Sequence, residues 1–196
     1  LSIAILVNIP AFLPKNKPEK ARSATITSKK PLTLLEKQEM FLQMAKRLDA
    51  DGLLSISPQR FAKICMVTSW CESNLRTDAK NGDMEGIWQW TADTRKRRKF
   101  PKTILDKDFA TQVGYCEIYL RSINKKIKFI KTSEDLHIIK FAPSRFHKDV
   151  FSETDNNPQL IPLDKNLDGQ ITRIDFTLQQ MQRVKENKVI RLMFEE

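Results

Sequence analysis

The stretch from Ser69 to Thr94 contains the side chains with the clearest chemical potential. Glu72 lies near the C-terminal end of an apolar helical pattern, and a turn-like segment, Gly86-Ile87-Trp88-Gln89, follows it. A carboxyl group held against apolar or aromatic surface has a raised pKa, because burial disfavours its charged form, and it can then act as an acid near neutral pH. The candidates for that surface are three nearby tryptophans, Trp70, Trp88 and Trp90. This pattern predicts a site in which Glu72 is the acid/base.

These residues resemble the soluble lytic transglycosylase and goose-type lysozyme superfamily, whose motif is Glu-Ser at a helix end, a later Ala, and Gly-x-x-Gln. The matching elements are Glu72-Ser73, Ala79 and Gly86 to Gln89, in a loop about one residue shorter than the family pattern. The resemblance implies a lysozyme-like helical fold that cleaves the bond between N-acetylmuramic acid and N-acetylglucosamine in peptidoglycan, with no cofactor for catalysis. It also implies that Glu72 protonates the glycosidic oxygen and later acts as a base. Ser73 and Gln89 would help hold the acid and the sugar.

The resemblance leaves both hydrolysis and transglycosylation open. Goose-type hydrolases use a downstream Asp to position water, and Asp83 is the best candidate because it opens the Gly-x-x-Gln turn. Transglycosylases need no second carboxylate, since the substrate's N-acetyl group assists and its 6-hydroxyl closes an anhydro ring. They tend to place a tyrosine in a late Ala-Tyr-Asn motif before Gly-Pro-Gly-Arg, and this chain has Lys140-Phe-Ala-Pro-Ser-Arg-Phe146 there, without the tyrosine. The expected substrate contacts, besides Ser73 and Gln89, are Trp88, Trp90 and Arg145.

The segment from Asp164 to Asp175 has the spacing of a calcium loop, with oxygen-bearing side chains at positions 1, 3, 5, 9 and 12 and a glycine at the sharp turn. It resembles EF-hand and dockerin loops, and an Asp at the twelfth position is the dockerin style. No convincing helix enters the loop, because Pro158 and Pro162 precede it. We therefore expect a half-hand that binds Ca²⁺ as a structural clip for the last helix; the alternative is an Asp/Asn-rich turn that caps this helix. The predicted ligands are Asp164, Asn166, Asp168, Gln170 through its backbone carbonyl, Thr172 and Asp175.

The net charge of +10 is uneven, because residues 1–31 hold six Lys and Arg against Glu19 and so carry +5. A basic protein is attracted to polyanions such as nucleic acid, an anionic membrane surface or acidic cell-wall polymers. The run Arg95–Lys99 is typical of a solvated face, and no nucleic-acid-binding motif accompanies it, so nucleic acid is not an expected partner. His137 and His147 are isolated, which predicts no metal or catalytic role for either.

Helical patterns surround the candidate site. A capping box at Thr33–Glu36 predicts a helix to about Asp49, and Ser57-Pro58 begins the helix that carries Glu72. An apolar stripe is predicted along this second helix, formed by Phe61, Ile64, Cys65, Thr68, Cys71 and Leu75. Apolar residues spaced by four and three predict a long helix over 109–127, and a shorter helix is expected over 133–141. A final helix follows Thr172, and the pattern places on one side of it Ile174, Leu178, Met181, Val184, Lys188 and Leu192.

Length and composition, 196 residues of which 40% are hydrophobic and 30% charged, are typical of a globular protein with one main domain. We expect a mostly α fold: an apolar N-terminal segment with a basic linker (1–31), a lysozyme-like catalytic domain (32–150), and an extension with the calcium loop and C-terminal helix (151–196). Residues 1–13 are too short to span a bilayer, and are either the end of a signal peptide or membrane anchor or a segment packed on a partner. The cysteines lack metal-ligand spacing and are expected to be buried, with one disulfide an open alternative: Cys65, Cys71 and Cys116.

The expected function is therefore that of a peptidoglycan lytic transglycosylase or muramidase. Its expected setting is local cell-wall opening by a bacteriophage virion or a bacterial secretion or conjugation apparatus, and its location a virion or the periplasm and cell envelope. Peptidoglycan is the expected substrate, and residues 1–31 are the expected contact with proteins of such an assembly. The alternative, favoured by the absent tyrosine, is a non-catalytic calcium-binding structural module.

Overall fold

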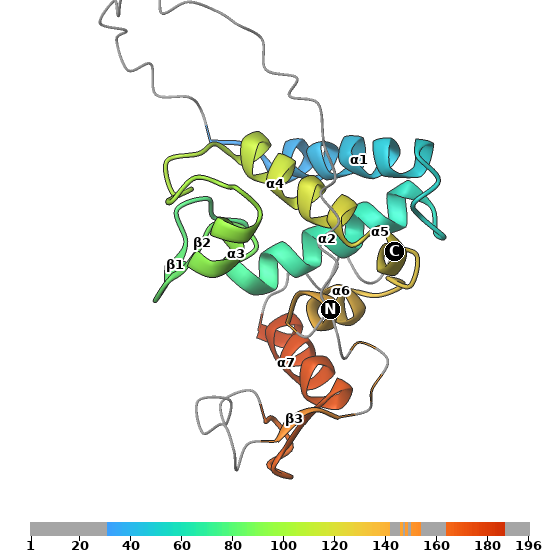
Figure 1. Ribbon diagram of the computed structural model, residues 1–196, viewed down its shortest axis with the longest axis vertical. Coiled ribbons are helices and arrows are strands. Elements are labelled where there is room, and N and C mark those ends of the chain that lie inside the picture. The colour runs from blue at the N-terminus through green and yellow to red at the C-terminus, as the bar shows by residue number, and fades with distance from the viewer. Residues whose placement is uncertain (1–30, 142–145, 147, 149, 154–163, 187–196) are drawn as a thin grey trace, which may run out of the picture. The chain divides into compact units, whose positions relative to one another are not determined.

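The computed structural model describes residues 31–141, 146, 148, 150–153 and 164–186, and those from Leu32 onward belong to one compact unit. The described part is mostly helical, which confirms the prediction of a mostly α fold (Figure 1). None of the described helices combines the length and the apolar content needed to cross a bilayer. The elements, in chain order, are α1 (Leu34–Ala50), α2 (Pro58–Ser73), β1 (Lys80–Asn81), β2 (Met84–Glu85), α3 (Ala92–Arg97), α4 (Phe109–Ser122), α5 (Asn124–Ile127), α6 (Ser133–Phe141), β3 (Val150–Glu153), β4 (Gln170–Thr172) and α7 (Arg173–Glu186).

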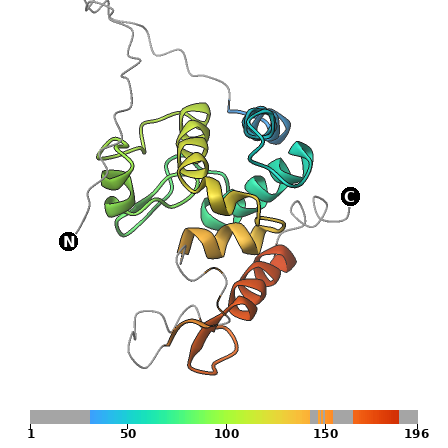
Figure 2. The ribbon, with the colours of Figure 1, turned by 45° about the vertical axis from the view of Figure 1, so that its right-hand side comes forward.

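The first two helices begin where their capping residues predict. The Thr33 hydroxyl accepts from the Glu36 backbone N–H, and the Glu36 carboxylate accepts from the Thr33 N–H, so each satisfies a donor at the start of α1. At α2 the Ser57 hydroxyl accepts from the Arg60 backbone N–H, and Pro58 occupies the first helical position. Figures 1 and 2 show α1 lying beside α2 and α4, with α6 on α2 and α7 on α6.

Helix α2 is the centre of this arrangement. The apolar stripe that the sequence predicts for it is buried, and residues on its other sides, including Met66 and Val67, are buried as well. A helix that is buried nearly all round can hold a polar side chain at its end in a fixed environment. The predicted stripe consists of Phe61, Ile64, Cys65, Thr68, Cys71 and Leu75. The three cysteines are buried free thiols, and burial raises the pKa of Cys65 and Cys116.

The long helix predicted over 109–127 is interrupted. Helix α4 ends at Ser122, and Ile123, with φ −107° and ψ 28°, separates it from α5. The apolar spacing continues across the break because both pieces bury one seam in the same core, where Leu120 and Ile127 are almost fully buried. Periodicity reports which face is buried and does not detect a local break in the hydrogen-bond ladder.

The segment between α2 and α4, which gives little strand signal, contains a small antiparallel hairpin. Strand β1 pairs with β2 through Lys80 with Glu85 and Asn81 with Met84, around a turn in which Gly82 has φ +60°. Glu85 then pairs with Trp90 in an isolated bridge, which closes a second tight turn over 86–89. The hairpin and this turn bring the segment back over the C-terminal end of α2.

The C-terminal part of the described chain packs on α6. Strand β3 pairs with β4 in antiparallel register, and α7 follows β4 directly. Phe176 faces inward and is 3% exposed, whereas three residues of the predicted apolar side, Ile174, Leu178 and Met181, are exposed. That side of α7 therefore does not face the core, because α7 contacts α6 through the face that carries Phe176.

Candidate active site

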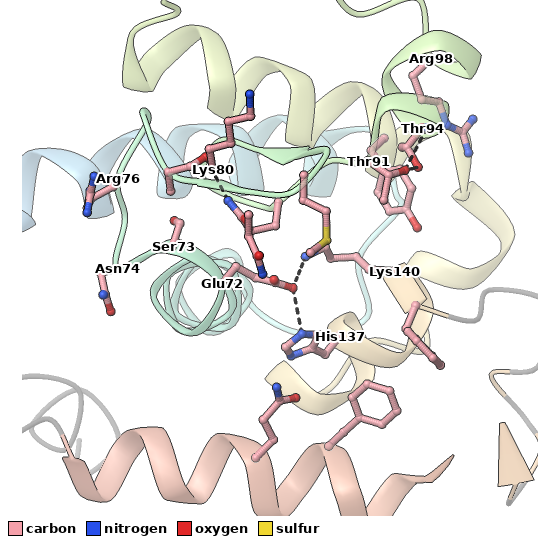
Figure 3. A pocket seen from close by; sticks show the side chains of 18 of the residues that line it. Glu72, Ser73, Asn74, Arg76, Lys80, Thr91, Thr94, Arg98, His137 and Lys140 are labelled. Carbon is pink, nitrogen blue, oxygen red and sulfur yellow. Dashed lines mark hydrogen bonds and ion pairs between the residues drawn. The ribbon is translucent and has the colours of Figure 1, made fainter. Parts of the chain in front are cut away.

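A cavity of about 980 Å³ opens at the C-terminal end of α2. Figure 3 shows the carboxylate of Glu72 inside it, with α6 and α7 on one side and the β1–β2 hairpin and α3 on the other. Its apolar lining comes from widely separated parts of the chain, and the polar lining surrounds the acid. The apolar residues are Ala79, Met84, Tyr119, Ile123, Phe141 and Phe176.

Glu72 reaches the cavity because α2 ends immediately after it. Asn74 adopts a left-handed conformation, with φ 54° and ψ 35°, and its N–H donates to carbonyls of the last helical turn. Asparagine tolerates this conformation better than most residues, so it is well suited to end the helix. The Glu72 side chain is 18% exposed, which leaves it mostly buried and still open to the cavity.

Two basic side chains of α6 bind the same oxygen of Glu72. The Oε1 atom lies 2.8 Å from Nε2 of His137 and 2.5 Å from Nζ of Lys140. Both partners are mostly buried, with side-chain exposures of 11% and 9%. Residues three apart lie on one face of a helix, so α6 presents them together.

The electrostatic balance at Glu72 differs from the predicted one. Burial raises the pKa of this carboxyl, but the charges and hydrogen bonds of Lys140 and His137 outweigh burial and hold the pKa well below its usual range. The expectation that apolar surface keeps Glu72 protonated is therefore wrong for the ligand-free protein. The apolar surface of the neighbouring tryptophans is outweighed by Lys140 and His137, two basic side chains that lie far along the chain from Glu72.

Gln89 lies in the same cavity as Glu72, as the motif predicts. It has φ 49°, and its Nε2 donates to the carbonyl oxygens of Gly86 at 2.9 Å and Ala79 at 3.2 Å. These bonds tie the turn to the loop after α2 and use the amide N–H donors within the protein. The three motif elements at Ala79, Gly86 and Gln89 are thus in mutual contact.

Ser73 joins α2 to the same turn. Its hydroxyl lies 2.9 Å from the carbonyl oxygen of Ser69, one helical turn earlier, and 3.0 Å from that of Ile87. The side chain is buried although it borders the cavity. Ser73 therefore anchors the Gly86–Gln89 turn against the helix end, and no hydrogen bond from it to the Glu72 carboxylate is present.

Trp88 and Trp90 are core residues, which corrects the prediction that they contact substrate. They are 0% and 3% exposed, and neither borders the cavity. The indole N–H of Trp88 donates to the Ser69 hydroxyl at 2.6 Å. Both rings lie under the Lys140 ammonium, at 5.5 and 5.9 Å from their centroids, within the range of a cation–π contact. Trp70, the third candidate, is partly buried and packs against the core.

Gln112 of α4, which the sequence analysis did not single out, positions the turn. It is fully buried, its Oε1 accepts from the Ile87 N–H at 2.9 Å, and its Nε2 lies 2.9 Å from the carbonyl oxygens of Thr77 and Ile104. A side chain at Gly86, which has φ +78°, would collide with the Gln112 amide. The glycine of the motif is therefore required by both its backbone conformation and its close packing.

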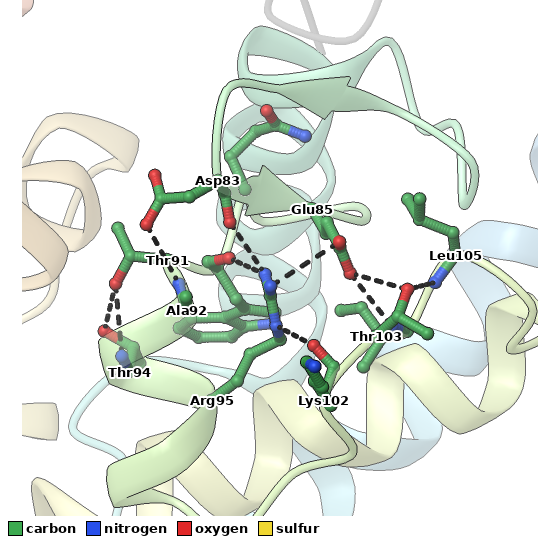
Figure 4. A network of polar contacts seen from close by, with 12 residues as sticks. Asp83, Glu85, Thr91, Ala92, Thr94, Arg95, Lys102, Thr103 and Leu105 are labelled. Carbon is green, nitrogen blue, oxygen red and sulfur yellow. Dashed lines mark hydrogen bonds and ion pairs between the residues drawn. The ribbon is translucent and has the colours of Figure 1, made fainter.

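Asp83 does not border the cavity and is exposed at the hairpin turn. Its carboxylate accepts from the Ala92 N–H at 3.2 Å, at the start of α3. The predicted role of Asp83 in positioning water beside Glu72 has no support in this placement, because its carboxylate is directed to a helix start. Figure 4 shows this contact together with the polar network beneath it.

That network is built on a buried ion pair between Glu85 and Arg95 (Figure 4). The two side chains are 7% and 6% exposed and 3.5 Å apart. Glu85 also accepts from the Ile104 N–H at 3.0 Å, and Arg95 donates to the carbonyl oxygen of Lys102 at 3.1 Å. Arg95 is therefore not part of a solvated basic face, as the run Arg95–Lys99 suggested; it fastens the loop that carries Gln89.

The loop from Asp164 to Asp175 is oxygen-rich, which suits a hard cation such as Ca²⁺. Its two terminal acids are buried, and their carboxylates accept loop N–H groups: Asp164 from Gly169 at 2.8 Å, and Asp175 from Lys165 at 2.7 Å. Within the described residues, no group of three or more His, Cys, Asp and Glu is placed to hold a metal ion. The calcium site thus stays a prediction, and the described bonds are those of a tight Asp/Asn turn before α7.

The predicted contact Arg145 lies outside the described residues, as does the segment 1–30 for which a partner was predicted. His137, which the sequence analysis dismissed as isolated, is central to the site. The signal that could have found it is the spacing of His137 and Lys140 on one helix face. Comparison of the chain with models of protein families, with curated proteins and with solved structures found no match.

Proposed function

We propose that this protein cleaves the glycosidic bond between N-acetylmuramic acid and N-acetylglucosamine, with Glu72 as the acid/base. The observation that carries the proposal is that Glu72 and Gln89, from segments separated by a loop, border one cavity of about 980 Å³. Ligand sites are commonly about 300–1,000 Å³, so a cavity of this size is large enough for a segment of a glycan chain. Neutral hydrogen-bonding groups for sugar hydroxyls and amides border it as well: Asn74, Asn81, Gln89, Thr91, Thr94 and Gln179.

Acid catalysis needs a protonated Glu72 when the bond breaks, whereas Lys140 and His137 hold the carboxylate ionised in the ligand-free protein. We assign the change to the substrate. A sugar that inserts between Glu72 and Lys140 separates the ion pair. This removes one of the two contacts that lower the pKa of Glu72, so burial raises that pKa against His137 alone. Lys140 keeps a favourable place after this separation, over the rings of Trp88 and Trp90.

The protonated Glu72 would donate to the glycosidic oxygen as the bond from that oxygen to the anomeric carbon breaks. The resulting Glu72 carboxylate then accepts a proton from the attacking group. That group is water in a hydrolase and the sugar's own 6-hydroxyl in a transglycosylase. No second carboxylate borders the cavity among the described residues, which favours the transglycosylase route.

The test compares muropeptides released from purified peptidoglycan by the wild type, Glu72→Gln and Glu72→Asp. Anhydro products indicate a transglycosylase and reducing ends a hydrolase; release that is equal in wild type and Glu72→Gln overturns the proposal. Glu72→Asp keeps the charge that pairs with Lys140 and moves the carboxyl by about an ångström, which is expected to reduce turnover about 100-fold. Glu39→Gln, an exposed position on α1, is the matched control and should retain full activity.

A non-catalytic module is the second candidate, and the depressed pKa of Glu72 favours it. In that role the contact of Glu72 with His137 and Lys140 is a structural link between α2 and α6. This candidate predicts no release of muropeptides by the wild type, together with loss of stability in Glu72→Gln.

As a separate proposal, the loop from Asp164 to Asp175 binds Ca²⁺ and ties α7 to the domain. For the setting we propose local opening of the wall by a virion or an envelope-spanning apparatus.

A further inference from the structure

The cavity around Glu72 has an excess of cationic side chains. Five Lys and Arg side chains border it, and Glu72 is the single acidic one among the described lining residues, so the formal balance is five minus one, or +4, with His137 neutral. These cations come from the loop after α2, from β1, from α3 and the residue after it, and from α6. They are Arg76, Lys80, Arg97, Arg98 and Lys140.

Three of the five have acidic partners. Arg76 pairs with Asp78 at 3.1 Å, Arg97 with Asp93 at 2.7 Å, and Lys140 with Glu72. Lys80 and Arg98, by contrast, form no ion pair with any described acidic residue. The charge available to a ligand therefore resides mainly on these two side chains.

Arg98 is held in place for binding. Its guanidinium lies over the ring of Tyr119, 5.4 Å from the centroid, and the residue is only partly exposed. A cation–π contact fixes the plane of the guanidinium while leaving its N–H groups free for a carboxylate. Lys80 projects from β1 and is exposed. Figure 3 shows Lys80 and Arg98 well apart along the wall of the cavity that faces α7.

We propose that Lys80 and Arg98 are two separate subsites for carboxylates carried by the glycan, so that the cavity selects an acidic glycan strand over a neutral one. This inference rests on the proposed function, because it assumes a glycan in the cavity. The guanidinium fork of Arg98 binds a carboxylate through two parallel hydrogen bonds, whereas Lys80 acts as a point charge. Lys80 lies on β1 and Arg98 follows α3, so the two side chains are separate positions on the cavity wall, and a strand with acidic groups at intervals can reach both.

The test measures affinity by calorimetry in the Glu72→Gln background with three probes of equal length. The first is neutral chitotetraose, the second a peptide-free tetrasaccharide of alternating N-acetylglucosamine and N-acetylmuramic acid, and the third the same strand with peptide stems. Lys80→Met and Arg98→Gln are each expected to weaken an acidic probe about tenfold, the size of one charge-assisted hydrogen bond, and to leave chitotetraose unchanged. The peptide-free and stem-bearing probes distinguish the sugar carboxylate from the stem carboxylates as the group bound. If Glu72→Gln is unstable, the comparison is repeated with KM values for the cleaved probes. These values are measured for Lys80→Met and Arg98→Gln with Glu72 intact, beside the wild type.

Lys96→Met is the matched control, because Lys96 is an exposed cation of α3 that does not border the cavity. Equal weakening by Lys96→Met, or equal weakening of neutral and acidic probes, overturns the subsites. Wild-type cleavage with an unchanged preference in Lys80→Met and Arg98→Gln overturns the subsites and leaves the proposed function standing. Loss of the acidic preference in these variants, without cleavage by the wild type, overturns the proposed function and supports the subsites.

Discussion

Nζ of Lys140 lies 2.5 Å from Oε1 of Glu72, and this contact joins the end of α2 to α6 across 68 residues of sequence. His137 binds the same oxygen, so two side chains of one helix determine the charge state of the acid. The protonation of Glu72 is therefore controlled by the position of α6. In the proposed catalytic cycle the contact between Glu72 and Lys140 breaks, while the Glu72 side chain stays buried.

Lys140→Met is expected to move the pH dependence of glycan cleavage. Lys140 lowers the pKa of Glu72, so its removal raises that pKa, and the protonated acid then persists to higher pH. The descending limb of kcat/KM against pH, which reports the acid of the free enzyme, should shift upward. Lys96→Met should leave the profile in place. A profile that is identical in wild type and Lys140→Met would contradict the control of Glu72 by Lys140.

The same contact predicts a dependence of stability on pH. Glu72 has a lower pKa in the folded state than its ordinary value of about 4.3, so its contribution to stability is fully present above that value. The contribution is lost as pH falls from there toward the depressed pKa. Urea denaturation between about pH 2 and 7 should show a steeper acid loss in the wild type than in Glu72→Gln. At neutral pH this variant should be less stable by about 3 kcal/mol, the lower end of the cost of breaking a buried pair. Equal slopes of unfolding free energy against pH in the wild type and Glu72→Gln would exclude a depressed pKa for Glu72.

Gly86→Ala tests the turn that carries Gln89. A methyl group there meets the Gln112 amide and Ile104, and the backbone has φ +78°. Strain and overpacking together should cost about 2–4 kcal/mol of unfolding free energy. Gly82→Ala is the matched control, because Gly82 has φ +60° with open space around it and should lose only about 1–2 kcal/mol. Chemical denaturation measures both, and similar losses would mean that the close packing on Gln112 contributes nothing.

Glu85→Gln tests the network under the hairpin. The substitution leaves the charge of Arg95 buried beside a neutral group, and removal of one partner of a buried pair costs about 3–5 kcal/mol. Asp93→Asn breaks the exposed pair with Arg97 and should cost less than about 1 kcal/mol. Melting curves of the two variants at neutral pH make the comparison. A small loss in Glu85→Gln would show that Arg95 relaxes toward solvent.

The calcium loop makes an independent prediction. Ca²⁺ at 100 times its dissociation constant should stabilise the folded wild type by about 2.7 kcal/mol, seen as a higher melting temperature that EGTA reverses. Asp164→Ala should remove this response, and Asp106→Asn, an exposed acid outside the loop, should retain it. A melting temperature of the wild type that Ca²⁺ and EGTA leave unchanged would favour the simple turn.

The sequence by itself determined the first two helices with their starts at Thr33 and Ser57, the short helix over 133–141, and the location of Glu72 at the end of a buried helix. These features depend on residues close together in the chain, through capping bonds and apolar spacing. Only the tertiary structure decided that Lys140 and His137 meet Glu72, that Trp88 and Trp90 enter the core, and that Asp83 turns away. The physical reason is that burial and charge pairing depend on contacts between segments far apart in sequence, which local patterns do not encode.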